Sequence, residues 1–177
     1  YNNMHSKLIT ITSYAGGGKT EVTKALAKQL NSTSVYHFDE IDEKVVFPKN
    51  FPNAEANEYN LDQIFQIIKK DKLNSTGFII FDYPFGKYHS KMNSLIDFAI
   101  YIDVPLDIAM CRRLLRDLDV DRLELLPQLI GELKYYELKG RDAYLYMLKN
   151  IKPTCDLVVD GTRSIDKIIT KIKEKIV

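Results

Sequence analysis

One stretch of the sequence decides the fold: Ser13-Tyr14-Ala15-Gly16-Gly17-Gly18-Lys19-Thr20. The residues before it, Lys7 to Thr12, are β-branched or apolar, which predicts a buried strand. After it, apolar side chains recur at helical spacing between Val22 and Leu30, which predicts an amphipathic helix. The stretch is therefore a tight, glycine-rich turn from a strand into a helix.

The glycine-rich turn has the composition of a phosphate-binding loop. It matches the pattern G-x-x-x-x-G-K-[ST], except that Ser13 stands at the first glycine. Glycines let backbone N–H groups point inward, and the start of the helix adds a positive dipole end, so phosphates are favoured there. We expect Lys19 to neutralise the β- and γ-phosphates of ATP and Thr20 to place its hydroxyl on Mg²⁺. A glycine-rich turn without a ligand is disfavoured, because the strand and helix that the motif requires are both present.

The rest of the chain alternates predicted strands with predicted helices. Further strands are expected at Ser34 to Phe38, Gly77 to Phe81, Phe98 to Ile102 and Asp156 to Val159. Helices are expected around Leu61 to Ile68, from Pro105 to about Asn150 with interruptions near Pro127, Gly131 and Gly140, and from Ile165 to Ile176. This alternation predicts a parallel sheet covered on both faces, with ligands at the carboxyl ends of its strands.

Three predicted strands end next to an aspartate: Asp39, Asp82 and Asp103. Asp82 follows an apolar strand, so we interpret it as a Mg²⁺ ligand, direct or through water, rather than as a strand-end cap. We interpret Asp39 as the carboxylate that orients the phosphate acceptor and accepts the proton of its hydroxyl. The alternative for Asp39 is a solvated turn acid, as we expect for Glu40 and Asp42.

Four arginines lie within eleven residues, at Arg112, Arg113, Arg116 and Arg122. The first three crowd one stretch of a predicted helix, which is unfavourable unless anions are near. Guanidinium groups suit the charge of a phosphoryl group in transfer, and a lid that carries them would exclude water. The alternative is a solvated basic face balanced by nearby aspartates.

Other polar and aromatic groups receive weaker interpretations. His37 and His89 have no partner at a catalytic or metal-binding spacing, so we assign them no role. Four aromatic side chains are interpreted either as stacking surfaces for a flat ligand or as ordinary packing: Phe51, Tyr59, Tyr83 and Phe85.

The composition favours one soluble domain over residues 1–177. The chain has 177 residues, of which 45% are hydrophobic, and a net charge of +1, so no overall field favours nucleic acid or a membrane. No stretch has the length of a membrane-spanning helix, and the two cysteines, Cys111 and Cys155, have no metal-ligand spacing. We therefore expect a cytoplasmic protein that acts on a small molecule, and the sequence also allows a homo-oligomer.

The chain resembles the uridine kinase and nucleoside monophosphate kinase branch of the P-loop kinases in several of the segments described above. The likeness covers most of the chain and rests on Ile9 to Thr20, Tyr36 to Asp39, Phe78 to Gly86, Ile102 to Ala109 with Arg112 to Asp117, and Asp156 to Gly161. It implies the α/β P-loop NTPase fold, a three-layer sandwich with a five-stranded parallel sheet and a helical lid at roughly residues 112–140. It also implies that Asp39 is the base and that adenine binds between the lid arginines and the loop around Gly161 to Arg163. The family's uridine-recognition segments are not found in this chain.

The main hypothesis is an ATP-dependent kinase that transfers the γ-phosphoryl group to a hydroxyl, with a nucleoside as the favoured acceptor. The hypothesis assigns catalysis to Asp39, Lys19, Arg112 and Arg116, Mg²⁺ binding to Thr20 and Asp82, and nucleotide binding to Ala15, Gly16, Gly17, Gly18, Lys19, Thr20, Glu21, Arg113 and Gly161. One alternative is a nucleoside monophosphate kinase, which is disfavoured because the expected flap from Glu43 to Tyr59 contains no arginine. The other is an NTP-hydrolysing switch that acts on a partner protein.

Overall fold

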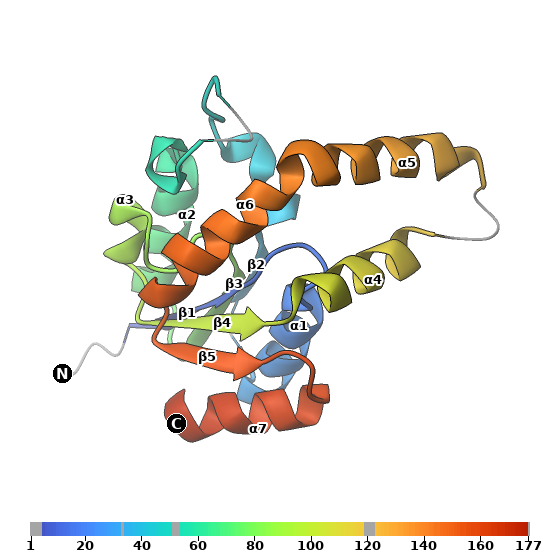
Figure 1. Ribbon diagram of the computed structural model, residues 1–177. Coiled ribbons are helices and arrows are strands. Elements are labelled where there is room, and N and C mark those ends of the chain that lie inside the picture. Colours follow the sequence, from blue (N-terminus) through green and yellow to red (C-terminus); the bar gives the residue numbers. More distant parts are fainter. Residues whose placement is uncertain (1–4, 33, 51–53, 119–122, 177) are drawn as a thin grey trace.

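A five-stranded parallel sheet forms the centre of the molecule (Figure 1). The computed structural model describes residues 5–32, 34–50, 54–118 and 123–176. The strands follow the order β2-β3-β1-β4-β5, and every pairing between neighbours is parallel. Their bounds are β1 Lys7–Thr12, β2 Ser34–His37, β3 Phe78–Asp82, β4 Phe98–Asp103 and β5 Leu157–Asp160. The strand that leads into the glycine-rich turn, β1, is therefore the middle strand.

Helices cover both faces of this sheet. The α-helices are α1 Lys19–Leu30, α2 Asp62–Asn74, α3 Ser90–Asn93, α4 Leu106–Asp117, α5 Leu126–Tyr135, α6 Arg141–Tyr146 and α7 Ile165–Ile176. Short 3-10 turns lie at Phe38–Glu40, Asp42–Lys44, Ala56–Glu58, Leu123–Leu125 and Lys152–Thr154, and π-helical turns at Tyr136–Gly140 and Met147–Ile151. Among the described residues, no helix combines the length and the apolar composition needed to cross a membrane.

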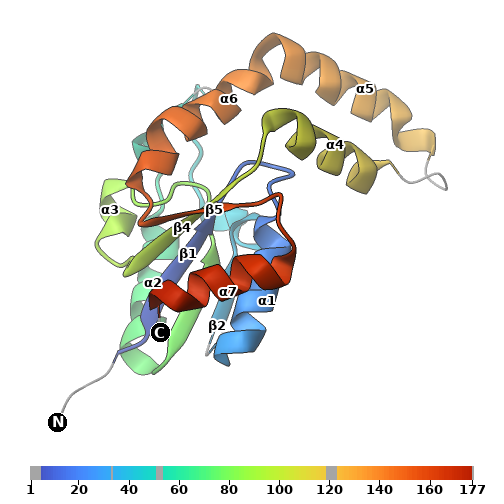
Figure 2. The same ribbon diagram turned by 60° about the horizontal axis from the view of Figure 1, so that its bottom comes forward.

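Two apolar clusters hold the layers together, one on each face of the sheet. Ile9 and Ile11 of β1 pack with α1 and α7, whereas Leu8, from the same strand, packs with α2 and α3. Successive strand side chains point to opposite faces, so a strand that is apolar throughout is buried on both sides. Figure 2 shows α1 and α7 together on one face of the sheet. The predicted three-layer arrangement with a five-stranded parallel sheet is confirmed.

Several predicted boundaries need correction. Asp82 and Asp103 are the last residues of β3 and β4 rather than the first residues after them, because the ladder with neighbouring strands continues one step further. The expected break at Gly131 is wrong, since this glycine lies inside α5. The interruption expected near Gly140 is the π-helical turn Tyr136–Gly140, which separates α5 from α6.

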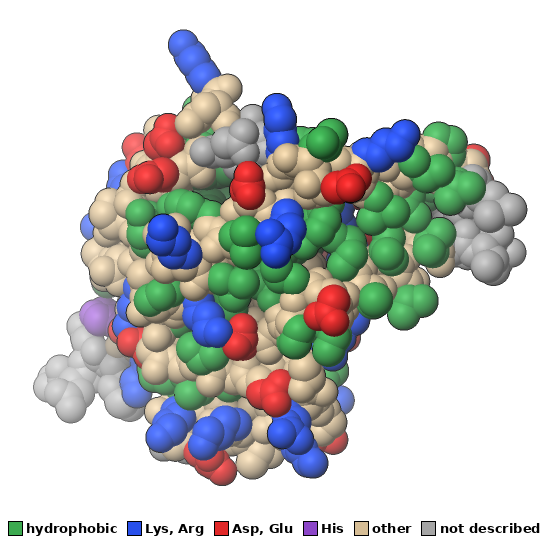
Figure 3. All heavy atoms as spheres, in the orientation of Figure 1, with side chains coloured by type: hydrophobic (Ala, Val, Ile, Leu, Met, Phe, Trp, Pro, Cys, Tyr) green, Lys and Arg blue, Asp and Glu red, His purple; other side chains and the backbone are tan. Residues whose placement is uncertain are grey.

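The segment from Leu106 to Gly140 forms an arm. Its two main helices, α4 and α5, extend away from the sheet and lie alongside each other (Figure 1). Hydrophobic side chains gather over this arm (Figure 3), and Leu115 and Leu138 are 76% and 77% exposed. Arg122 lies outside the described residues, as do residues 51–53 of the expected flap, including Phe51.

Candidate functional site

The glycine-rich turn joins β1 to α1 at the carboxyl end of the middle strand. Gly16 and Gly18 have φ angles of 82° and 88°, in the left-handed region that favours glycine. Gly18 is also the N-cap of α1, so the turn ends at the positive end of the helix dipole. A Cβ on Gly16 would lie 2.0 Å from the carbonyl oxygen of Ala109 in α4. The backbone of the turn therefore packs directly against the base of the arm.

The structure explains how Ser13 replaces the first glycine of the motif. Ser13 is not among the described residues with positive φ, so its position does not need the freedom of glycine. Its side chain is buried, and its hydroxyl donates a hydrogen bond of 2.8 Å to the carbonyl of Ile102 in β4. A Cβ on Gly17 would lie 1.9 Å from Ser13 Oγ. Ser13 thus fills the space that Gly17 leaves open.

This packing predicts a compensating pair of substitutions. Gly17→Ala is expected to lower the free energy of unfolding by about 1–3 kcal/mol, because its methyl group overlaps Ser13 Oγ. Adding Ser13→Gly removes the overlapping atoms and should restore most of the lost stability. Urea denaturation of the two single variants and the double variant measures the coupling. A double variant no more stable than Gly17→Ala would refute this explanation.

Lys19 and Glu21 lie in the first turn of α1. Lys19 is half-buried, and its side chain makes no hydrogen bond or ion pair in the described parts of the chain. A partly buried ammonium group without a counter-ion is costly, so its surroundings are suited to an anion. Glu21 is exposed, on the outer side of the same turn.

Thr20 and Asp82 meet across the sheet edge. Thr20 Oγ1 donates a hydrogen bond of 3.1 Å to Asp82 Oδ2, and Asp82 is only 5% exposed. His37 Nδ1 lies 3.5 Å from the same carboxylate oxygen. The sequence analysis missed His37, because its partner is remote in sequence. Strand register would have revealed this contact, since His37 and Asp82 are opposite each other at the ends of two neighbouring parallel strands.

Two other aspartates at the sheet edge have different surroundings. Asp39 is exposed in the turn Phe38–Glu40 that directly follows β2, and it has no hydrogen bond or ion pair within the described residues. Asp39 therefore lies at the carboxyl edge of the sheet, as Asp82 does. Asp103 instead accepts a hydrogen bond of 2.7 Å from Lys152 Nζ, so its charge is already balanced.

The arginines of α4 bind groups of the protein itself. Arg112 Nη1 donates to the carbonyl oxygen of Gly161 at 2.9 Å, which links α4 to the loop after β5. Arg113 Nη2 donates to Glu132 Oε2 at 2.6 Å, and Arg113 Nε lies 3.6 Å from Asp117 Oδ2. Arg116 binds Asp117 through Nε and Nη2, at 2.7 and 3.2 Å.

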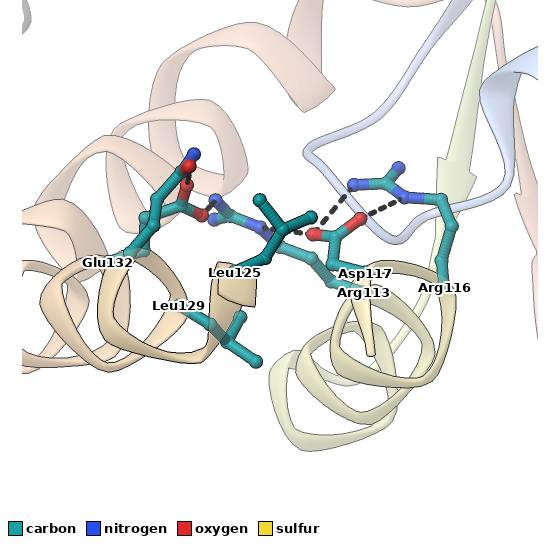
Figure 4. Close-up of a pocket in the computed structure, with 7 residues that line it drawn as sticks. Arg113, Arg116, Asp117, Leu125, Leu129 and Glu132 are labelled. Carbon is teal, nitrogen blue, oxygen red and sulfur yellow. Dashed lines mark hydrogen bonds and ion pairs between the residues drawn. The ribbon is translucent and has the colours of Figure 1, made fainter. Parts of the chain in front are cut away.

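The carboxylates of Asp117 and Glu132 line a pocket between α4 and α5 (Figure 4). The hydrogen bond from Arg116 lowers the pKa of Asp117 below its usual value, so Asp117 is ionised at neutral pH. Arg113 and Arg116 are thus neutralised by acidic side chains of the arm itself. An anionic ligand would have to compete with Asp117 and Glu132 for them.

The aromatic residues considered as stacking surfaces belong mainly to the core. Tyr83 is completely buried, and Tyr59 is buried beside Phe85, with ring centroids 4.9 Å apart. Both buried tyrosines belong to the cluster beneath α2 and α3. His89 is also structural, since its Nε2 lies 3.0 Å from the carbonyl oxygen of Tyr59.

The chain is similar in sequence to two curated uridine kinases. It is 24% identical over 208 residues to the uridine kinase of Schizosaccharomyces pombe (strain 972 / ATCC 24843), a match that covers 94% of this chain and 44% of that protein. It is 23% identical over 201 residues to the uridine kinase of Ligilactobacillus salivarius (strain UCC118), a match that covers 94% of this chain and 92% of that protein. The chain therefore spans less than half the length of the first relative.

A solved structure shares the fold. Shikimate kinase from Acinetobacter baumannii, in complex with shikimate, superimposes with a TM-score of 0.61 over 97% of this chain and 96% of that chain, at 15% identity. A five-stranded parallel sheet with a glycine-rich turn at its middle strand is the arrangement of the P-loop NTPase fold, the fold that P-loop kinases share. The chain belongs to the Phosphoribulokinase / Uridine kinase family, whose model matches residues 34–122. That region includes Asp39, Asp82 and the arginines of α4, and the glycine-rich turn precedes it.

Proposed function

We propose that this protein transfers the γ-phosphoryl group of ATP to a hydroxyl of a small molecule, and that the acceptor is a nucleoside. One observation carries the proposal. Lys19 has no counter-ion within the described residues, and it lies between the glycine-rich turn and the Thr20–Asp82 pair. This arrangement suits a triphosphate, whose charge the lysine, the backbone N–H groups and the helix end would balance.

Roles on the donor side follow from this placement. In the proposal, Ala15, Gly16, Gly17 and Gly18 surround the phosphates with backbone N–H groups, and Lys19 binds the β- and γ-phosphates. Glu21 is assigned to the nucleotide site only because it lies in the same helical turn as Lys19 and Thr20. The purine lies towards Arg113 and the loop at Gly161, a location supported by the hydrogen bond between Arg112 and Gly161.

The Thr20–Asp82 pair is suited to Mg²⁺. A hydroxyl and a carboxylate are the oxygen donors that Mg²⁺ prefers, and Mg²⁺ is usually bound through one or two such groups together with substrate phosphates. The described residues contain no group of three or more His, Cys, Asp or Glu side chains that could hold a metal ion by themselves. When bound, Mg²⁺ would neutralise charge on the β- and γ-phosphates.

On the acceptor side, Asp39 is proposed to orient the hydroxyl and to accept its proton. Its exposure and lack of partners support this role, because an incoming substrate does not have to displace a counter-ion. Arg112 and Arg116 are proposed to balance charge on the phosphoryl group during transfer, with the arm at about residues 112–140 acting as a lid. The segment from Glu43 to Tyr59 has no arginine for a second phosphate, which favours a nucleoside over a nucleoside monophosphate.

We further infer a single cytoplasmic kinase domain over residues 1–177, without nucleic-acid or membrane partners. The near-zero net charge supports the absence of nucleic-acid and membrane partners. Exposed apolar side chains on the arm, such as Leu115, support self-association. Sedimentation velocity at rising protein concentration distinguishes a homo-oligomer from a monomer.

A turnover assay with a panel of acceptors tests the proposed function. ATP consumption and phosphorylated products are followed with nucleosides, with nucleoside monophosphates and with water alone, each with and without Mg²⁺. We expect Mg²⁺-dependent turnover that requires a nucleoside and yields a nucleoside monophosphate. Product from a nucleoside monophosphate alone would select the alternative kinase. ATP hydrolysis without any phosphorylated acceptor would contradict the kinase proposal and favour an NTP-hydrolysing switch.

A further inference from the structure

Tyr144 of α6 connects two parts of the proposed site that are distant in sequence. Its ring packs against Tyr14, the second residue of the glycine-rich turn, with ring centroids 5.0 Å apart. Its hydroxyl accepts a hydrogen bond of 3.3 Å from Arg113 Nη1 of α4. The ring of Tyr136 packs edge-on against its other side, with centroids 5.1 Å apart. One side chain therefore contacts both the phosphate loop and the arginine-bearing arm.

Tyr14 is a buried residue of the glycine-rich turn, and its hydroxyl has a partner at the end of β4. It is only 3% exposed, and its hydroxyl donates a hydrogen bond to the carbonyl oxygen of Val104 at the end of β4. Burial raises the pKa of Tyr14 to about 12, which keeps this hydroxyl protonated as a donor. Tyr101 packs on its ring from the sheet, with centroids 6.5 Å apart. Tyr144 therefore packs on a residue of the loop that is itself buried and hydrogen-bonded.

Arg113 is aimed by partners from three segments. Glu132 belongs to α5 and Asp117 to the end of α4, and both are carboxylates on the arm. Tyr144 lies on α6, outside the arm, where it packs against the core cluster that includes Tyr14, and its hydroxyl is the third partner. The two carboxylates therefore belong to the arm that carries Arg113, whereas Tyr144 links the guanidinium to the phosphate loop.

We propose that Tyr144 is a positioning residue that couples the phosphate loop to Arg113. Its ring holds the loop through Tyr14, and its hydroxyl fixes the direction of the Arg113 guanidinium towards the nucleotide. The inference rests on the proposed function only in that the loop and Arg113 bind ATP.

A double-mutant cycle on ATP affinity tests this coupling. Equilibrium ATP binding is measured by calorimetry for the wild type, Tyr144→Phe, Arg113→Gln and the double variant. Tyr144→Phe keeps the ring on Tyr14 and removes only the hydroxyl, so we expect ATP affinity to fall about fivefold. In the Arg113→Gln background, the same change is expected to alter affinity less than about twofold, because its target is gone.

Two further variants separate positioning from general packing. Tyr144→Leu also removes the ring contact with Tyr14, so we expect a loss larger than that of Tyr144→Phe and only partly suppressed by Arg113→Gln. Tyr135→Phe, which removes a hydroxyl from an exposed tyrosine at the end of α5, is the matched control and should leave affinity unchanged. Thermal unfolding of each variant confirms that the fold is retained.

Each outcome bears on the inference. Equal losses from Tyr144→Phe in both backgrounds, or no loss in the wild-type background, would overturn it, because the hydroxyl would then not act through Arg113. Suppression of the loss by Arg113→Gln supports it. If the proposed function itself fails at the nucleotide site, the wild type binds no ATP, which is seen before any variant is compared. If only the acceptor assignment fails, ATP binding and its coupling remain measurable.

Discussion

Lys19→Ala is expected to lower kcat for phosphoryl transfer by on the order of 100- to 1,000-fold, comparable with the loss of a preorganised donor at developing charge. The physical reason is that Lys19 is the cation at the start of α1, directly after the glycine-rich turn, and has no counter-ion among the described residues. In the proposed function, removing it leaves the β- and γ-phosphates without their principal balancing charge. Initial rates at saturating ATP and acceptor, together with ATP affinity, measure the effect.

The matched control for this prediction is Lys24→Ala. Lys24 lies on the same helix, α1, and is exposed to solvent. The substitution removes one positive charge from the same element, and its kcat should stay within about twofold of wild type, because exposed charges act weakly at a distance. Comparable losses from both variants would show that the net charge of α1, rather than the location of Lys19, controls the rate. The assignment of Lys19 to the phosphates would then be withdrawn.

Asp39→Asn is expected to reduce phosphoryl transfer by about 100- to 10,000-fold while ATP affinity stays near the wild-type value. An amide can still accept a hydrogen bond from the acceptor hydroxyl, but it cannot take up its proton at neutral pH. Because Asp39 has no partner in the described structure, the substitution breaks no internal contact and the fold should be unaffected. Steady-state rates and equilibrium ATP binding separate the catalytic effect from the binding effect.

Asp42→Asn provides the comparison for Asp39. Asp42 is an exposed acid three residues further along, in the next short turn, where we assign no role. Its amide variant should transfer phosphate at the wild-type rate. Unchanged turnover in Asp39→Asn would remove this residue as the base. A parallel loss of ATP affinity in Asp39→Asn would place it on the donor side instead.

The arginine cluster shows where sequence reasoning reached its limit. The crowding of Arg112, Arg113 and Arg116 on one helix correctly indicated that anions must be near. The alternative of balance by nearby aspartates holds for Asp117, which binds Arg116, but nothing in the sequence indicated Glu132, which comes from another helix. The partner of a long charged side chain depends on which helices lie alongside each other, and local patterns do not specify that α4 and α5 do so.

His37 is a residue to which the sequence assigned no role although the structure gives it a partner. Nothing near it in sequence forms a partner, so the sequence analysis assigned it no role. Its neighbour Asp82 comes from a strand that follows much later, and the two meet only because β2 and β3 pair in register. Strand order and register depend on how the whole sheet packs, which neighbouring residues do not determine.

The glycine-rich turn was determined by the sequence itself. Three consecutive glycines, a lysine and a threonine between a β-branched run and an amphipathic run specify a strand, a turn and a helix through local conformational preference and periodicity alone. Only the tertiary structure decided how Ser13 is tolerated and which groups surround the turn. The space for its side chain beside Gly17 and the contact of Tyr14 with Tyr144 arise from packing between remote segments, whose geometry depends on the whole chain.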